Sequence, residues 1–389
     1  MDHAPKPLYY SVTAIVEVAG LFVFGLSDSQ SSFDYFVVGY GLMALGGNLT
    51  MLGAFPASFL LPEYQTGILA ANSCLFDASS IAFFVFYRLN IAFGWSRKDI
   101  FMVYAVVSIL VYTALGICWY VLEQKDWKHV VELESAAAAE STQDDSEDDM
   151  QDEVNSNISV DLQRQKLLTQ LKSREFALIT CFTAAHMLRA NLYIMTVDDL
   201  LRFMGDVTGL YANIFSFVLP CGVIFVPVID YTVRRMGVLK TLHLTNLLGV
   251  IFGAFLCIPI LGIQIATFGF FACFRAYLYA TANTFIAVYF GVETMGRVIG
   301  VTFTSAAIVS LTQYPIAIFA GHGYWLEVNW IMLGVCVLPI LLVVFYKETQ
   351  PHELPKRASF AAYSPALPIS LSQRMSERLS MSQRLREDF

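Results

Sequence analysis

The 389-residue chain is 56% hydrophobic, has only 14% charged residues and carries a formal net charge of −8. A soluble protein usually carries about 25% charged residues, so this composition excludes a soluble protein and predicts an integral membrane protein. The acidic residues are concentrated in one loop, and the negative balance argues against a nucleic-acid-binding protein.

Apolar runs long enough to cross a membrane recur along the chain. A helix needs about 20 mostly apolar residues to span the hydrocarbon core. Ten segments meet this condition, at residues 9–27, 34–61, 66–88, 99–122, 174–203, 207–231, 238–260, 262–290, 296–320 and 326–346. They predict an all-α, polytopic membrane protein with about ten transmembrane helices, four plus six, in bundles of the transporter or channel kind.

A hydrophilic insert separates the fourth apolar segment from the fifth. It is rich in Ala, Ser, Asp and Glu, and its acidic block from Asp144 to Glu153 repels itself, which is typical of disorder. We therefore expect an N-terminal helical bundle at 1–122, a disordered acidic loop at 123–172, a six-helix bundle at 173–346 and a disordered tail at 347–389.

The distribution of Lys and Arg predicts the orientation. One set of loops holds Arg234, Arg235, Lys240 and Arg297, and outnumbers the other set, although the cluster from Arg88 to Lys98 argues the other way. We expect the N-terminus, the acidic loop and the C-terminus to lie in the cytosol. Whether the membrane is the plasma membrane or an organelle membrane stays open.

The segment 262–290 contains a single arginine, Arg275. An ionised side chain at bilayer depth costs about 2.5–3.5 kcal/mol on insertion scales, and such residues usually face a bundle interior or a watery cavity. Tyr279 and Asn283 follow at four and eight positions and share one helical stripe with Arg275. This stripe is the first candidate for a solute pathway.

The segment 174–203 carries a second stripe, formed by His186, Arg189 and Tyr193. Arg189 is expected to face the same cavity as Arg275 and to bind an anionic substrate group or a carboxylate. The alternative is a buried ion-pair partner that holds two helices together. His186 by itself is a weaker candidate.

Two acidic residues lie within the first and third apolar segments. Asp77 must face inward, where it binds a substrate amine, a proton or an arginine on a neighbouring helix. Glu17 is a candidate proton-coupling residue, and Asn48 on the second segment is expected to face the cavity.

A short charged stretch follows the sixth apolar segment. Asp230, Arg234, Arg235 and Gly237 place an acid, a basic pair and a turn glycine where a helix leaves the membrane, as suits a switchable ion-pair latch. The seven cysteines have no metal-ligand spacing, and the chain carries no GxSxG, HExxH or Walker A pattern. We therefore predict no enzyme, no metal site and no cofactor.

These residues resemble the major facilitator superfamily, because the stretch from Asp230 to Gly237 is similar to its cytosolic loop motif. Three further stretches are similar to the large neutral amino acid transporter branch and to protozoan and fungal amino-acid transporters: ANSCLFDASS, HMLRANLYI, and FRAYLYATANTF with its continuation to Pro315. The resemblance covers most of residues 1–346.

The resemblance also exposes a difference from the superfamily, which has twelve helices around a long cytosolic loop. Here the loop follows only four. The opening MDHAPKP is similar to the end of the first loop motif, with Asp2 as its acid. The family's first two helices are therefore expected upstream of Met1, unless this chain is a ten-helix form, and the N-terminal bundle is expected to be incomplete.

The resemblance implies a rocker-switch carrier with a site near the membrane midplane. We expect facilitative transport of amino acids, large neutral or cationic, with Arg189, Arg275, Tyr193, Tyr279, Asn48, Asn283 and Asp77 at the site and Asp230, Arg234, Arg235 and Asp2 at the gates. The partners are then a small-molecule solute and the lipid bilayer. One alternative is a proton-coupled carrier of sugars or carboxylates that uses Glu17 or Asp77. Another is a non-transporting membrane sensor or scaffold. The amino acid, the coupling ion, the direction of flux and the oligomeric state are left open.

Overall fold

The computed structural model describes residues 6–28, 33–59, 61, 64–140, 166–291 and 294–349. Residues Met1–Tyr346 cluster as one unit, distinct from Lys347–Phe389, and the fold described here is that of the first. The expected latch residue Asp2, most of the expected acidic loop and almost all of the expected tail lie outside the described residues.

The described chain is helical throughout, with no strand in those residues. Before the acidic loop the helices are α1 (Lys6–Leu26), α2 (Tyr35–Ala54) with the short η1 (Phe55–Phe59), α3 (Gln65–Ala78), α4 (Ile81–Phe93) and α5 (Arg97–Glu140). After it come α7 (Leu167–Gln170), α8 (Arg174–Phe203), α9 (Leu210–Val218), η3 (Leu219–Phe225), α10 (Val226–Met236), α11 (Val238–Leu256), η4 (Leu261–Ile263), α12 (Gln264–Phe290), α13 (Met295–Ser310), α14 (Gln313–Gly321) and α15 (Trp325–Thr349).

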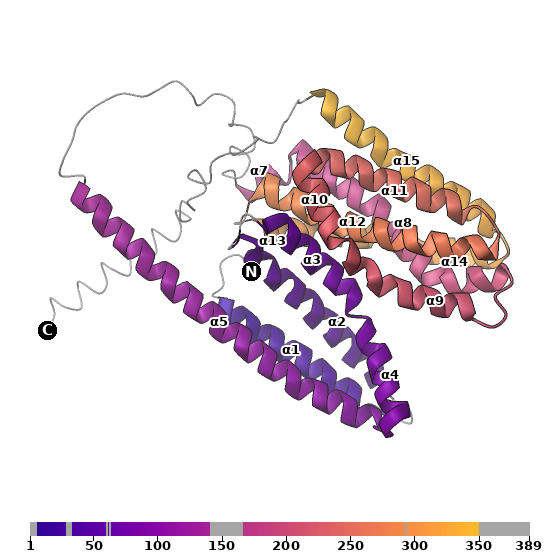
Figure 1. The fold of residues 1–389 in the computed structure, drawn as a ribbon, viewed down its shortest axis with the longest axis horizontal. Coiled ribbons are helices and arrows are strands. Elements are labelled where there is room, and N and C mark those ends of the chain that lie inside the picture. The colour runs from indigo at the N-terminus through magenta and orange to yellow at the C-terminus, as the bar shows by residue number, and fades with distance from the viewer. Residues whose placement is uncertain are drawn as a thin grey trace. The chain divides into compact units, whose positions relative to one another are not determined.

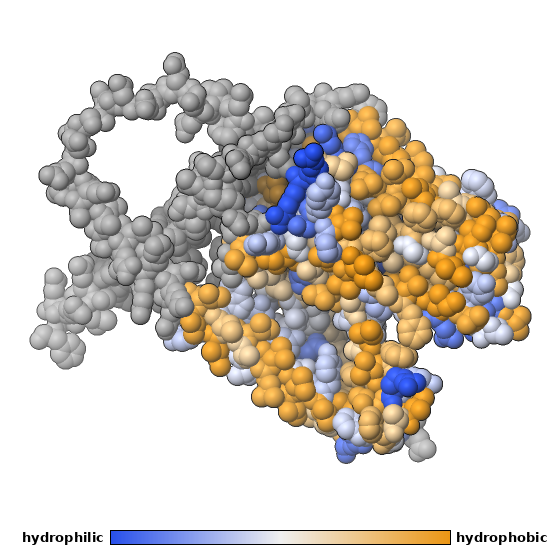
Figure 2. All heavy atoms as spheres, viewed as in Figure 1, coloured by the Kyte–Doolittle hydropathy of each residue, from blue (hydrophilic) through white to orange (hydrophobic). Residues whose placement is uncertain are grey.

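The expected all-α, polytopic class is confirmed, and the ten predicted segments all fall on helices or on consecutive helices. Nine spans within the described residues are long and apolar enough to cross a membrane. The tenth predicted segment is α8, a 30-residue helix, which is not among the nine because polar residues such as His186 and Arg189 interrupt its apolar run. Apolar side chains cover much of the face visible in Figure 2, as a bilayer requires. The protein is therefore a multi-pass integral membrane protein.

The structure corrects the expected start of the disordered loop. Helix α5 continues to Glu140 instead of ending at 122. The stretch 123–140 is rich in Ala and Glu, which are strong helix formers. The first part of the segment that we expected to be disordered, residues 123–140, is therefore helical, and the acidic block from Asp144 to Glu153 lies outside the described residues.

Local sequence explains where several helices begin and bend. Asp34 accepts hydrogen bonds from the backbone N–H of Phe36 at 3.0 Å and caps α2, while the Ser173 hydroxyl caps α8 through Phe176 N–H at 3.1 Å. Such side chains satisfy backbone donors that have no partner in the first turn. Helices α9 and α10 are separated by η3, with Pro220 inside η3 and Pro227 in the first turn of α10, and each proline removes a backbone donor.

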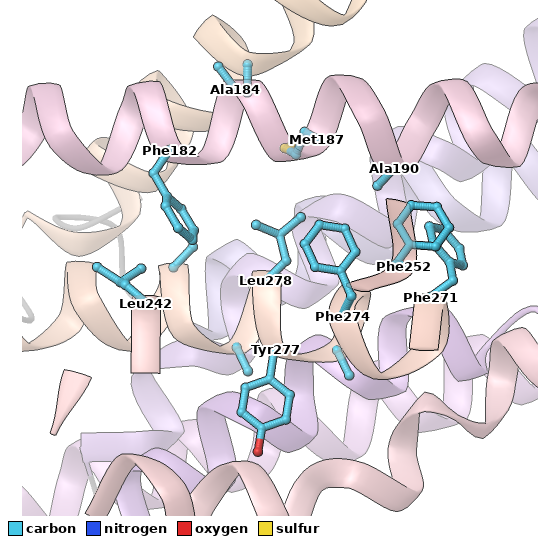
Figure 3. Close-up of a cluster of buried hydrophobic side chains, with 14 of the residues drawn as sticks. Phe182, Ala184, Met187, Ala190, Leu242, Phe252, Phe271, Phe274, Tyr277 and Leu278 are labelled. Atoms are coloured by element: carbon cyan, nitrogen blue, oxygen red, sulfur yellow. The ribbon is translucent and has the colours of Figure 1, made fainter. Parts of the chain in front are cut away.

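The main hydrophobic core lies among α8, α11 and α12. Figure 3 shows Phe252 of α11 grouped with Phe271 and Phe274 of α12, and Phe182 of α8 near Leu242 of α11. A smaller core, formed by Leu21, Phe101 and Ala105, holds α1 to α5. The two cores correspond to two groups of packed helices.

Helix α3 packs on the helices of the main core. It contacts α12, η3 and α10 more extensively than it contacts α2, and Figure 1 shows it beside α10 and α12. Helix α1, by contrast, packs on α2 and α5. Residues 65–93 thus connect the two groups, with α3 against the main core.

Candidate functional site

Two of the sequence-predicted stripes meet where α3 packs against α12. On α3, Ser73 and Asp77 are one turn apart and lie on one face of the helix. On α12, Arg275, Tyr279 and Asn283 form the predicted stripe. Asp77 contacts Arg275, and Ser73 contacts Asn283, so the two helices run antiparallel at this place. We call these five residues the α3–α12 site.

An ion pair occupies one end of the α3–α12 site. Arg275 Nε donates to Asp77 Oδ2 at 2.7 Å and Arg275 Nη2 donates to Oδ1 at 2.9 Å. The side chains are 11% and 12% exposed. Two parallel charge-assisted hydrogen bonds give this pair both strength and a fixed geometry, so Asp77 has the third of its predicted roles, that of a partner for an arginine on another helix.

A neutral hydrogen bond lies one turn away from the ion pair on α3 and about two turns away on α12. Asn283 Nδ2 donates to Ser73 Oγ at 3.0 Å, and Ser73 Oγ donates to the Leu69 carbonyl at 2.8 Å. Leu69, Ser73 and Asn283 are all buried. Ser73 and Asn283 thus hold the same two helices together that the ion pair joins.

Two buried polar atoms of the α3–α12 site have no hydrogen-bond partner among the described residues. Arg275 Nη1 is a buried donor without a hydrogen-bond partner, and Asn283 Oδ1 is a buried acceptor without one. The Arg275 guanidinium lies 5.0 Å from the centroid of the Tyr279 ring, a cation–π distance, and Tyr279 stacks on Phe303 at 6.0 Å. A free donor, a free acceptor and an aromatic face are features of small-molecule sites.

Burial along residues 65–93 changes at the α3–α12 site. Helix α3 buries Leu69, Ala70, Ser73 and Cys74, whereas no residue of α4 is buried. The first half of residues 65–93 is therefore buried against the main core, whereas the second half contacts it less closely, at Phe84 and Phe217 of α9. The Asp77–Arg275 ion pair lies near the end of α3, where the buried part of residues 65–93 ends.

Two of the expected latch residues, Asp230 and Arg234, lie close to the start of α3. A Cβ added to Gly67 would lie 3.3 Å from Asp230 Cγ and 3.3 Å from Asp230 Oδ1, so α3 approaches this carboxylate closely. Asp230 accepts from Arg234 Nε at 2.9 Å, and the Arg234 guanidinium lies 5.8 Å from the Tyr64 ring. Asp230 and Arg234 of α10 thus contact the start of α3, while Arg235 is exposed.

Arg189 lies in a different environment from Arg275. Its Nη1 donates to the Met332 carbonyl at 2.8 Å and to Cys336 Sγ at 2.9 Å, both on α15. The guanidinium lies 5.0 Å from the centroid of Phe252 on α11, and the residue is 2% exposed. The expectation that Arg189 and Arg275 share a cavity is therefore wrong, because the α8 stripe packs against α11 and α15 whereas the α12 stripe packs against α3.

The other predicted site residues also lie apart from the α3–α12 site. Tyr193 packs edge-on against Phe252 and Phe271. His186 Nε2 lies 2.6 Å from Asn246 Oδ1. Asn48 is exposed and donates to the carbonyl of Ala44 on its own helix at 2.9 Å.

Two further polar features lie elsewhere in the described residues. Glu17 is buried between α1 and α2, close to Gly46, and its Oε2 has no hydrogen-bond partner. A crevice of about 540 Å³ lies between α8, α14 and α15 and includes Asp199 and Trp325, but none of the predicted site residues. No three His, Cys, Asp or Glu side chains of these residues come together as metal ligands would.

The fold and the α3–α12 site define a multi-pass membrane protein with a buried ion pair between helices. No protein-family model matches the chain. Protein FMP42 of Saccharomyces cerevisiae is 22% identical over 341 residues, which are 73% of this chain and 66% of FMP42. The equilibrative nucleobase transporter 1 of Bos taurus is 35% identical over 80 residues, which are 21% of this chain and 16% of that protein. The chain thus spans less than two thirds of either relative.

A solved structure is similar over more of the chain, but at low identity. It is the crystal structure of a bacterial homologue of the iron transporter ferroportin in an outward-facing state. The likeness has a TM-score of 0.48 and 14% identity, and it covers 89% of this chain and 84% of that one.

Proposed function

We propose that this protein carries small solutes across a membrane by alternating access, with amino acids as the solute class. The observation that carries the proposal is the Asp77–Arg275 ion pair between α3 and α12. A buried ion pair adds little stability compared with apolar packing of similar volume. Its value here lies in being a contact that breaks and forms again between two defined states.

The uneven burial of residues 65–93 supports the same proposal. Helix α3 is buried against the main core, whereas α4 has no buried residue and meets that group of helices through the ring of Phe84, 5.0 Å from the ring of Phe217 on α9. The protein is therefore packed more tightly at the α3 end of residues 65–93. Residues 65–93 and α5 are consecutive helical segments of the chain. If each crosses the membrane once, the start of α3 lies on the same side of the membrane as the loop 123–172. With the orientation expected from the basic loops, that side is the cytosol.

The resemblance to the major facilitator superfamily agrees with a carrier and points to amino acids. The local likeness to a bovine protein named as a nucleobase transporter also agrees with transport and favours nucleobases as a second candidate. The α3–α12 site has groups that suit either solute. Arg275 Nη1 donates, Asn283 Oδ1 accepts, and the Tyr279 ring offers an aromatic face.

Uptake into proteoliposomes tests the proposal. The purified protein is reconstituted and presented with radiolabelled amino acids and, separately, with radiolabelled nucleobases. We expect saturable uptake of amino acids, and we expect Arg275→Ala to abolish it. Arg202→Ala is the matched control, because Arg202 pairs with Asp198 on an exposed helix surface.

Two results would count against the proposal. Absence of uptake for every amino acid and nucleobase would remove the carrier function. Uptake that is unchanged in Arg275→Ala would remove the role of the α3–α12 site. Uptake of nucleobases alone would keep the carrier function and replace the solute class by the second candidate.

A further inference from the structure

We propose that the solute is a zwitterion that inserts into the Asp77–Arg275 ion pair, so that solute binding itself separates α3 from α12. This inference rests on the proposed function. The solute carboxylate takes the place of Asp77 on the Arg275 guanidinium, and the solute ammonium takes the place of Arg275 on the Asp77 carboxylate. One ion pair becomes two.

Charge balance supports this exchange. The α3–α12 site holds one carboxylate and one guanidinium, each about nine-tenths buried, so its net charge is zero. An anionic solute would take Arg275 and leave Asp77 buried without a partner, and a cationic solute would leave Arg275 without one. Removing one partner of a buried pair costs about 3–5 kcal/mol. A zwitterion supplies both replacement charges in one molecule.

The geometry offers a first contact before the pair breaks. Nε and Nη2 of Arg275 donate to Asp77, whereas Nη1 has no hydrogen-bond partner in the described part of the chain. A solute carboxylate therefore binds Nη1 first and then moves onto the bidentate position as Asp77 withdraws. The side of the site toward α4 is the less buried one, and the solute arrives from there.

This exchange explains how binding is coupled to opening. A ligand shifts a conformational equilibrium only by its differential affinity for the two states. In the closed state Asp77 already occupies the fork of Arg275, so the zwitterion binds weakly. Once α3 has moved away both charges are free for the solute, and the zwitterion binds more tightly. A solute with one charge lacks this difference.

A disulfide between α3 and α10 reports the closed state without altering the α3–α12 site. In the double variant G67C/D230C the sulfur of residue 230 takes the place of Asp230 Cγ, which lies 3.3 Å from a Cβ at residue 67. A sulfur at this place is within bonding reach of a sulfur carried by the Cβ of residue 67, as a disulfide requires. The rate of disulfide formation under a mild oxidant measures how often the two positions meet. The single variants G67C and D230C control for the seven native cysteines.

The probe is an equimolar mixture of leucine, methionine and phenylalanine. We expect it to slow disulfide formation about tenfold, the factor that corresponds to about 1.4 kcal/mol. 3-Methylbutylamine has the leucine amine without the carboxylate, and 4-methylpentanoate has the carboxylate without the amine. We expect neither to slow the reaction, alone or mixed, because neither carries both charges on one molecule.

A variant that lacks both charges separates the loss of the ion pair from the effect of leaving one charge buried without a partner. In D77N/R275Q both charges are removed, so the helices have no buried unpaired ion. When G67C/D230C is introduced into this background, we expect that the amino-acid mixture does not slow disulfide formation between positions 67 and 230. A response there equal to that of the parent double variant would overturn the inference.

The remaining outcomes separate the inference from the proposed function. If proteoliposomes take up amino acids but the amine or the acid alone slows disulfide formation as much as the amino acids, the insertion idea is wrong and the carrier stands. The same holds if a nucleobase such as uracil is taken up and slows the reaction. If no solute is taken up and none slows the reaction, both proposals fail.

Discussion

Substituting Gly253 on α11 by alanine tests whether the close approach of α11 to Arg189 is real. A Cβ at this position would lie 2.6 Å from Arg189 Cζ and 2.8 Å from Arg189 Nη1. Both distances are shorter than any ordinary contact of a methyl group. The guanidinium has little freedom to move, because it is held by the Met332 carbonyl and by Cys336.

The magnitude follows from three effects. Overpacking a well-packed interior costs about 1–3 kcal/mol. Displacing the guanidinium weakens a hydrogen bond from a charged donor, which contributes about 1.5–3 kcal/mol. Alanine gains up to about 1 kcal/mol over glycine from helix propensity. We therefore expect Gly253→Ala to lower the free energy of unfolding by about 2–4 kcal/mol.

The assay is unfolding in mixed micelles with increasing SDS, followed by circular dichroism. Gly334→Ala is the matched control, since it lies on α15 and a Cβ there would meet nothing within 4 Å. In an Arg189→Met background the alanine at 253 should cost less, because the guanidinium that it meets is gone. The reasoning is refuted if Gly253→Ala is as stable as Gly334→Ala.

Three further predictions use the same unfolding assay. Phe271→Ala should cost about 3–5 kcal/mol, because its fully buried ring packs on three other aromatic rings; a cost below 1 kcal/mol would mean that this core is loosely packed. Arg202→Ala should cost less than about 1 kcal/mol, since its ion pair is largely exposed, and a larger loss would show that Arg202 has a buried partner. Glu17→Gln should change stability by less than about 1 kcal/mol, because one carboxyl oxygen is buried without a partner and a neutral acid fits that environment; a loss above about 2 kcal/mol would instead show an ionised, paired Glu17.

The helices could be predicted from sequence because the bilayer imposes a length. A run of about 20 apolar residues is a local property, and all ten predicted segments are helical. The bends could not be predicted in the same way. The rod 65–93 is divided into α3 and α4 at Ser79 and Ser80, and nothing in the apolar run indicates that only its first half is buried.

The α3–α12 site could be predicted in part. The stripe on α12 and the inward position of Asp77 followed from helical spacing and from the cost of a charge in lipid. The choice of partner did not follow, since Arg189 and Arg275 have similar local patterns. The difference between them lies in which helix is opposite, and that is a long-range property of the fold.

The partners of Arg189 had no signal in the sequence. A carboxylate was expected, whereas the structure provides a backbone carbonyl, a cysteine sulfur and an aromatic face. Carbonyl groups occur at every position and are not visible in a residue pattern. The close approach of α11 to Arg189 requires glycine at position 253, because only glycine leaves room for the guanidinium there.

The most direct test of the central claim is amino-acid uptake by proteoliposomes that contain G67C/D230C, measured before and after oxidation. Alternating access requires α3 to leave α10 in each cycle, so a disulfide between positions 67 and 230 should stop uptake, and its reduction should restore uptake. Each oxidised single variant should keep the uptake rate that the same variant has when reduced. Equal uptake rates in the reduced and the fully oxidised double variant would contradict the account, because solute would then cross while α3 stays in place.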